Sequence, residues 1–95
     1  MDARENLHVR AIVHGRVQMV GFRAFVIRHA GESGLSGTVR NLDDGTVEAV
    51  LEGPAPAVRR MVDLLREGPS HARVRRVDVE YGTPTGTLPA MMVAS

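Results

Sequence analysis

Hydrophobic and polar residues alternate along residues 7–14, Leu-His-Val-Arg-Ala-Ile-Val-His, and several of them are β-branched. This pattern predicts a strand that is half buried against a second layer. From Phe22 the apolar positions 22, 25, 26 and 30 follow the spacing of one helical face, and Gly34 is suited to end that helix. The sequence therefore predicts a strand, a loop with glycine at both ends over 15–21, and a helix from Phe22 to about Ser33.

A β-hairpin is predicted next. Its strands cover 35–41 and 46–52 and join through Leu42-Asp43-Asp44-Gly45, where Gly45 suits a positive φ. Along the second strand the apolar residues share one face and the acidic residues share the other: Val47, Ala49 and Leu51 against Glu48 and Glu52. Such a strand is typical of a sheet that a helical layer covers on one side only.

A second helix follows Gly53-Pro54, because proline is tolerated at a helix start and an apolar stripe recurs at positions 57, 58, 61, 62 and 65 before Gly68-Pro69. Alternation from Val77 to Glu80 predicts a fourth strand, although Val74 breaks the period, which a bulge or a late strand start would explain. For the tail, residues 83–95, two interpretations stay open: a short edge strand over 90–94, or a weakly ordered segment. Weak order also stays open for residues 1–6.

The predicted order of elements is strand, helix, strand, strand, helix, strand. This order matches the ferredoxin-like α+β sandwich, an antiparallel sheet with two helices on one face. A chain of 95 residues fits one domain, so we expect 1–95 to fold as a single unit. The architecture hosts unrelated activities, and function must therefore be argued from the site.

Composition excludes several classes of protein. No stretch approaches the apolar length of a membrane span and the first residues lack a signal peptide's apolar run, so we expect a soluble, cytoplasmic protein. The absence of cysteine rules out disulfides and thiol catalysis. All 12 basic residues are arginine and the net charge is +1, which excludes lysine-based catalysis and favours two-pronged anion contacts. Three aromatic residues are too few for the usual stacking platforms, so we expect no nucleic-acid partner.

The loop before the first helix is the main candidate site. Free amides at a helix start, the positive end of the helix dipole and Arg23 in the first turn all favour an anion such as phosphate. From spacing alone, an ordinary glycine-hinged connection with a surface arginine is the favoured alternative. The segment is not a Walker loop, because five residues separate Gly15 from Gly21 and no Lys-Ser/Thr follows.

Other polar residues favour structural roles. No metal site is predicted, because metal-ligand spacing is lacking among the histidines at 8, 14, 29 and 71. A calcium loop aligned on Gly45 would need glutamate where Leu51 stands. No nucleophilic triad is evident for Ser33, Ser36 or Ser70. A solvated strand face is the favoured interpretation of Arg73, Arg75 and Arg76.

Two segments resemble the signatures of the acylphosphatase family. They are Gly15-Arg16-Val17-Gln18-Met19-Val20-Gly21-Phe22-Arg23 and Gly37-Thr38-Val39-Arg40-Asn41-Leu42-Asp43-Asp44-Gly45-Thr46-Val47-Glu48. The resemblance extends over roughly residues 8–80. It implies that Arg23 and Asn41 are catalytic, Arg23 by binding phosphate and Asn41 by positioning the attacking water. It also implies a phosphate-binding loop made of Gly15, Arg16, Val17, Gln18, Met19 and Val20.

The implied activity is hydrolysis of a small acyl phosphate to carboxylate and inorganic phosphate by a monomer without a cofactor. Two alternatives stay open. One is a non-catalytic module that binds acyl or carbamoyl phosphate, as acylphosphatase-like domains do within larger hydrogenase-maturation proteins. The other is an interaction domain for protein or RNA.

Two residues depart from the family's usual pattern. Met19 stands where the family usually has glycine, and Thr38 stands where it usually has an aromatic residue. If the loop needs a positive φ at position 19, methionine carries strain of roughly 1–2 kcal/mol, and we expect a perturbed phosphate cradle and reduced activity. We expect Thr38 to affect strand packing more than phosphate contact.

The implied chemistry needs few groups. The leaving carboxylate has a conjugate acid with a pKa of about 4, so no general acid is required. Phosphoryl transfer passes through a loose transition state that positioning and electrostatics stabilise, which makes a metal dispensable. A carboxamide cannot accept a proton near neutral pH, so Asn41 can only hold the water. We hypothesise that the phosphate itself takes the water's proton.

Overall fold

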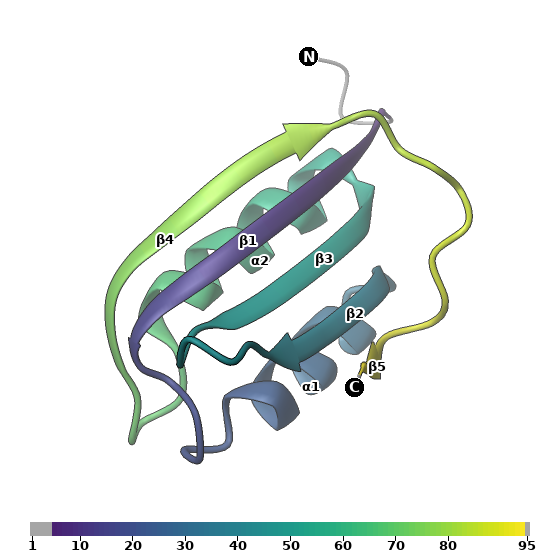
Figure 1. Cartoon of the computed structure of the whole chain (residues 1–95). Coiled ribbons are helices and arrows are strands. Elements are labelled where there is room, and N and C mark those ends of the chain that lie inside the picture. The colour runs from purple at the N-terminus through teal and green to yellow at the C-terminus, as the bar shows by residue number, and fades with distance from the viewer. Residues whose placement is uncertain (1–4, 95) are drawn as a thin grey trace.

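The computed structural model describes residues 5–94, and these form seven elements in a two-layer arrangement (Figure 1). In chain order they are β1 (Asn6–Arg16), α1 (Phe22–Glu32), β2 (Ser36–Asn41), β3 (Val47–Pro54), α2 (Ala55–Glu67), β4 (Arg73–Gly82) and β5 (Met92–Val93). The predicted α+β, ferredoxin-like order is confirmed, and the short edge strand that stayed open for 90–94 is present as β5. Among the described residues, neither helix has the length and apolar character that a bilayer crossing requires.

The strands form one sheet in the order β4-β1-β3-β2-β5, and both helices lie on the same face of it (Figure 1). The four long strands pair antiparallel, as predicted, whereas β5 pairs parallel with β2. The tail therefore returns across one end of the sheet to cover its β2 edge. Whether 83–95 is weakly ordered stays a prediction, and residues 1–4 and 95 of the expected weakly ordered ends lie outside the described residues.

The hydrophobic core lies between the sheet and the helices. On β1 the residues Val9, Ala11 and Val13 are fully buried, and they stand opposite the equally buried Leu51, Ala49 and Val47 of β3. Successive strand residues point to opposite faces, which puts both apolar sets on the helix side. Each fully buried Val or Leu side chain contributes about 1.5–3 kcal/mol, so this register is strongly specified.

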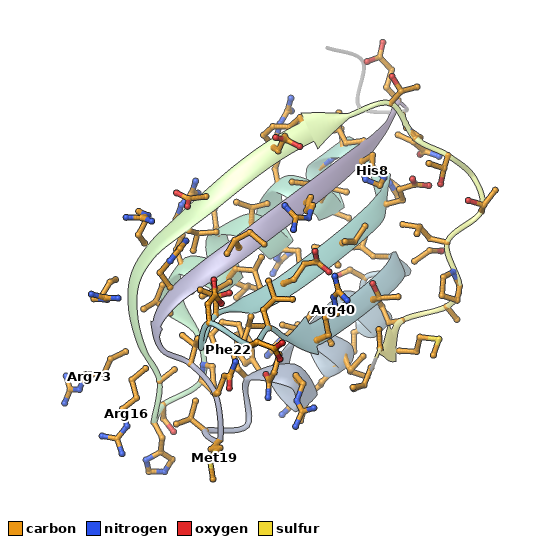
Figure 2. All side chains as sticks on the ribbon, in the orientation of Figure 1. His8, Arg16, Met19, Phe22, Arg40 and Arg73 are labelled. Carbon is orange, nitrogen blue, oxygen red and sulfur yellow. The ribbon has the colours of Figure 1, made fainter. Side chains whose placement is uncertain are left out.

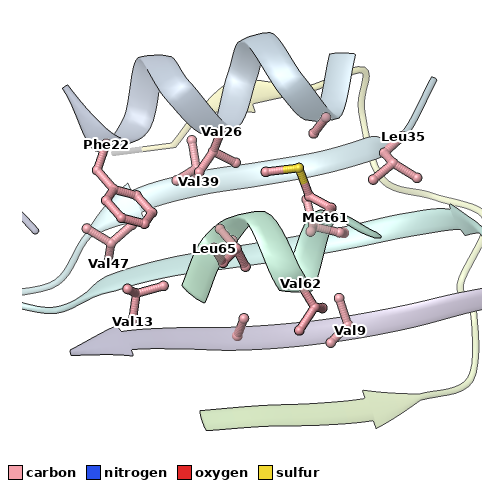
Figure 3. Packing of buried hydrophobic residues seen from close by; sticks show 14 of the residues in the cluster. Val9, Val13, Phe22, Val26, Leu35, Val39, Val47, Met61, Val62 and Leu65 are labelled. Carbon is pink, nitrogen blue, oxygen red and sulfur yellow. The ribbon is translucent and has the colours of Figure 1, made fainter. Parts of the chain in front are cut away.

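The helices close the core with their predicted apolar stripes (Figure 3). In α1 the buried residues are Phe22, Val26 and Ala30, and Phe22 at the helix start is only 2% exposed. In α2 they include Val58, Met61, Val62 and Leu65. Because Phe22 packs against the core, the first turn of α1 is fixed against the sheet.

The face of the sheet away from the helices carries charge. Glu48 of β3 lies between two arginines and accepts hydrogen bonds of 2.8 Å from Nε of Arg10 and of 2.8 Å from Nε of Arg40. The Glu48 side chain is 7% exposed, so the pair of guanidinium groups compensates a carboxylate largely removed from water. The predicted division of β3 into an apolar and an acidic face is confirmed.

The largest difference from the sequence expectation lies where β1 meets the loop. Gly15 and Arg16, expected in the loop, belong to β1 and pair with β4, which begins at Arg73 rather than near Val77. A register shift between His14 and Gly15 leaves Arg75 as an extra residue, so the predicted bulge is present. Gly53-Pro54, expected to open the second helix, instead ends β3.

Candidate active site

The loop between β1 and α1 spans residues 17–21 and has two left-handed residues. Met19 has φ 61° and Gly21, at the helix N-cap, has φ 81°. Among the described residues, the N–H groups of 17–21 find no hydrogen-bond acceptor within the protein. Left-handed residues next to right-handed ones turn neighbouring N–H groups toward one side, a geometry that can bind an anion. The free N–H groups in the first turn of α1 extend it.

Arg23 stands in this first turn, directly after the buried Phe22. Its side chain is exposed and, within the described part of the chain, the guanidinium has neither an ion-pair nor a hydrogen-bond partner. By contrast, Arg28 one turn later on the same helix pairs with Glu32 at 3.3 Å. Arg23 is therefore an unpaired cation beside the loop, carried by a helical turn whose backbone the buried Phe22 fixes.

Asn41 is the last residue of β2. It stands two positions after the fully buried Val39, so both side chains point to the sheet face that α1 covers, whereas Arg40 points to the open face and pairs with Glu48. The strand period therefore turns the Asn41 carboxamide toward the start of α1. Asn41 is only partly buried, which leaves the carboxamide accessible.

These residues share one pocket of about 390 Å³. Its lining includes loop residues Val17 and Met19, the helix-start residues Gly21 to Ala24, Asn41, and Val93 of β5. The structure therefore brings Arg23 and Asn41, 18 positions apart in the sequence, to the same cavity as the loop. Of the predicted loop residues, Gly15, Arg16, Gln18 and Val20 do not line it; Gly15 and Arg16 lie in β1.

Gln18 holds the loop in place, a role that the sequence analysis missed. Its side-chain Nε2 donates to the carbonyl oxygen of Leu42 at 2.8 Å and to that of Thr46 at 2.9 Å. Both acceptors lie in the turn between β2 and β3, directly after Asn41. A single carboxamide therefore connects the loop to the strand end that carries Asn41.

The turn that receives Gln18 is itself firmly closed. Leu42 and Thr46 are joined by a backbone hydrogen bond of 2.9 Å, and Asp44 accepts from the Thr46 hydroxyl at 2.6 Å and from its N–H at 3.0 Å. These hydrogen bonds from Thr46 lower the pKa of Asp44. Gly45 has φ 92°, as its predicted position in the turn required. The anchor for the loop is therefore a rigid one.

Both departures from the family pattern have defined surroundings. Met19 is the sole non-glycine residue with positive φ among residues 5–94, so the condition under which strain was expected is met. Its side chain is 99% exposed and packs against nothing that would compensate the strain. Thr38 lies within β2 opposite Val50 and beside Met92 of β5, away from the pocket lining.

No cluster of three or more His, Cys, Asp or Glu suited to a metal occurs in the described residues. The fold defines a small α+β sandwich of the ferredoxin-like architecture. The chain belongs to the acylphosphatase family, since the family model matches residues 9–88. Its activity is the hydrolysis of acyl phosphates.

Individual relatives agree with the family match. An acylphosphatase from Roseiflexus sp. (strain RS-1) is 57% identical over 74 residues, which are 78% of this chain and 80% of the relative. The crystal structure of acylphosphatase from Bacillus subtilis superposes with a TM-score of 0.90 at 36% identity, covering 94% of this chain and 99% of that one. A T. kodakarensis HypF structure also matches, with a TM-score of 0.78 and 36% identity, but covers 92% of this chain and only 12% of HypF.

Proposed function

We propose that the pocket between the loop and α1 is the site of hydrolysis and that Arg23 and Asn41 divide the work there. The observation that carries the proposal is the common lining: the unpaired Arg23, the accessible Asn41 and the loop residue Met19 border the same cavity. The substrate's phosphate lies against the loop N–H groups and the first turn of α1. Arg23 makes two parallel charge-assisted hydrogen bonds to its oxygens.

Asn41 holds the attacking water in line with the bond to the leaving carboxylate. The water oxygen bonds to phosphorus, the bond from phosphorus to the acyl oxygen breaks, and both water protons remain on the phosphate. The products are a carboxylate and dihydrogen phosphate, so charge and atoms balance without a protein base. Arg23 and the amides stabilise the charge spread over the equatorial oxygens, which is where a loose transition state needs it.

We also propose that the enzyme acts as a cytoplasmic monomer. Arg23, Asn41 and the loop residues Val17 and Met19 of a single chain line the same pocket, which supports a monomeric catalyst. The cysteine-free sequence is compatible with a reducing compartment. A single species at the mass of one chain in light scattering, unchanged across the concentrations used for assay, is the expected result; a dimer that loses activity on dilution would contradict it.

The non-catalytic binding module is the less favoured function. It was suggested by Met19, yet the relatives that match this chain over most of their own length are named acylphosphatases, whereas the HypF match is confined to 12% of that protein. Benzoyl phosphate hydrolysis in the presence of a chelator distinguishes the two functions. Turnover supports the enzyme, and phosphate binding without turnover would support the module.

The division of roles is tested with three variants in the same assay. Arg23→Ala should lower kcat/KM by about 10²–10³ and weaken inhibition by inorganic phosphate, because it removes the phosphate's cation. Asn41→Ala should lower kcat by about 10² and leave the phosphate inhibition constant nearly unchanged. Arg28→Ala, on the same helix but outside the pocket, controls for lost charge and should match the wild type. Equal loss of binding and turnover in both site variants would refute separate roles.

A further inference from the structure

A second cavity borders the same loop, and Asn41 is not part of its lining. It measures about 590 Å³ and is lined by Arg16, Met19, Val20, Ser70, His71, Ala72 and Arg73. The residues come from the end of β1, from the loop, from the turn between α2 and β4, and from the start of β4. Figure 2 shows Arg16, Met19 and Arg73 projecting from the same end of the molecule.

The two arginines in this cavity are neighbours in the sheet, and both side chains are exposed. Arg16 and Arg73 stand opposite each other in the antiparallel register of β1 and β4. Their approach depends on Gly15: a Cβ there would lie 2.0 Å from the Arg73 carbonyl oxygen, so only glycine lets β4 come this close. Like charges directly opposite each other in a sheet are destabilising, and the fold nevertheless places them there.

No acidic residue compensates this pair. The cavity lining contains no Asp or Glu, and within residues 5–94 neither guanidinium has an ion-pair partner. Arg76, three residues further along β4, behaves differently and pairs with Asp78 at 3.1 Å. The predicted solvated strand face is confirmed in that Arg73, Arg75 and Arg76 are all exposed on β4. Arg73 additionally lines a concave site together with Arg16.

The two cavities meet at Met19, which lines both of them. A phosphate bound beside Arg23 consequently has the second cavity on the other side of one exposed, unbranched and flexible side chain. The acyl part of a bound substrate can extend past Met19 without leaving the protein surface. An acyl part long enough to pass Met19 would reach the cavity that the two guanidinium groups line together with Ser70 and His71.

We propose that this second cavity binds a negatively charged group on the acyl part of the substrate, and that the enzyme prefers acyl phosphates that carry such a second anion. The inference rests on the proposed function of the first pocket. Arg73 acts as a specificity residue: it contributes charge-assisted hydrogen bonds to the distant anion and makes no contact with the phosphorus. A neutral acyl group would not reduce the electrostatic repulsion between Arg16 and Arg73.

The test compares substrates that differ only in the distant charge. Monoacyl phosphates of adipic, suberic and sebacic acid, each with a free carboxylate, are assayed beside their ω-methyl esters. The series varies the reach, and the ester keeps shape while removing the anion. For the best-fitting length we expect kcat/KM to be roughly tenfold higher for the carboxylate than for its ester at low salt, with a smaller ratio at high salt.

Two variants separate the cavity from general charge. Arg73→Gln should bring the carboxylate-to-ester ratio close to one. Arg75→Gln removes the same charge from the same strand but outside this cavity, and it should keep the wild-type ratio. The inference would be overturned by a carboxylate-to-ester ratio near one in the wild type at every chain length, or by an equal fall of this ratio in both variants. Hydrolysis of the esters would in that case still support the proposed function. If neither substrate class were hydrolysed, the proposed function and the inference would both fail.

Discussion

The side-chain nitrogen of Gln18 lies 2.8 Å from the carbonyl oxygen of Leu42. Leu42 directly follows Asn41, and the same nitrogen also reaches the Thr46 carbonyl oxygen at 2.9 Å. The loop and the strand end that carries Asn41 are therefore positioned relative to each other by one side chain. We expect Gln18 to act as a positioning residue, through geometry rather than by contact with substrate.

Replacing Gln18 tests this expectation. Gln18→Met keeps the length of the side chain but removes both donated hydrogen bonds, which should lower the free energy of unfolding by about 1–3 kcal/mol. Because the carboxamide of Asn41 would no longer be held at a fixed distance from the loop, kcat should fall by about tenfold or more, measured with benzoyl phosphate.

The split between kinetic constants distinguishes positioning from general stability. Inhibition by inorganic phosphate should weaken less than kcat falls, because the loop amides and Arg23 remain in the variant. A Gln18→Met protein that is less stable but turns over at the wild-type rate would make the residue purely structural.

The fold was largely predictable, because local sequence patterns specify most of its elements. Periodicity specified both helices and the two faces of β3, and turn chemistry specified Gly45. The hydrogen bond from Gln18 to Leu42 was not predictable, because it joins residues 24 positions apart and has no periodic signal. A glutamine in a glycine-bounded loop facing a hairpin turn could have suggested such an anchor.

The extent of β1 and β4 was missed for a related reason. A glycine after an alternating segment predicts a loop, but Gly15 continues β1 because strand β4 needs space at that position. Only the pairing with β4 reveals this need. The site residues Arg23 and Asn41 were taken from the family resemblance, and the local rules contributed the anion-binding character of the loop.

Gly15 can be tested against a second glycine in the same protein. Gly15→Ala puts a methyl group 2.0 Å from the Arg73 carbonyl oxygen and forces alanine to φ 132°, so the free energy of unfolding should fall by about 2–4 kcal/mol. Gly31→Ala, in α1 with open space around the new methyl group, should raise it by about 0.5–1 kcal/mol. Chemical denaturation measures both. Similar effects of the two substitutions would show that β4 does not depend on Gly15.

Met19 provides a test of backbone strain at the site. Met19→Gly should relieve roughly 1–2 kcal/mol of left-handed strain, partly offset by the greater freedom of glycine in the unfolded chain, so a net gain of up to about 1 kcal/mol is expected. We expect the relaxed loop to raise kcat/KM for benzoyl phosphate.

Met19→Ala is the matched control, because alanine removes the exposed side chain but keeps the strained φ. It should leave stability within about 0.5 kcal/mol of the wild type. If the alanine variant gained as much activity as the glycine variant, the side chain rather than the backbone would be responsible.

Glu52 attaches the tail to the sheet. The carboxylate is buried and accepts hydrogen bonds from the Thr85 N–H at 2.7 Å, the Thr85 hydroxyl at 2.9 Å and the Gly86 N–H at 3.0 Å, and it contacts His8. Burial opposes ionisation, but these hydrogen bonds outweigh it and lower the pKa of Glu52 to about 2. The tail then continues to β5, whose Val93 lines the candidate active-site pocket.

The lowered pKa makes this attachment sensitive to acid. The ordinary pKa of the group is 4.5, so the unfolded chain binds the proton first as pH falls. The stabilisation is complete above pH 4.5 and is lost as pH falls toward about 2. Glu52→Gln should be less stable than the wild type by about 1–3 kcal/mol at neutral pH, because a neutral amide accepts these hydrogen bonds less well. The difference should shrink as the pH is lowered through this range, measured by denaturation at each pH.

Glu67→Gln, an exposed control, should change the neutral-pH free energy of unfolding by less than about 0.5 kcal/mol. A Glu52→Gln deficit that stayed constant from neutral pH to pH 2 would mean that ionisation of Glu52 does not stabilise the tail.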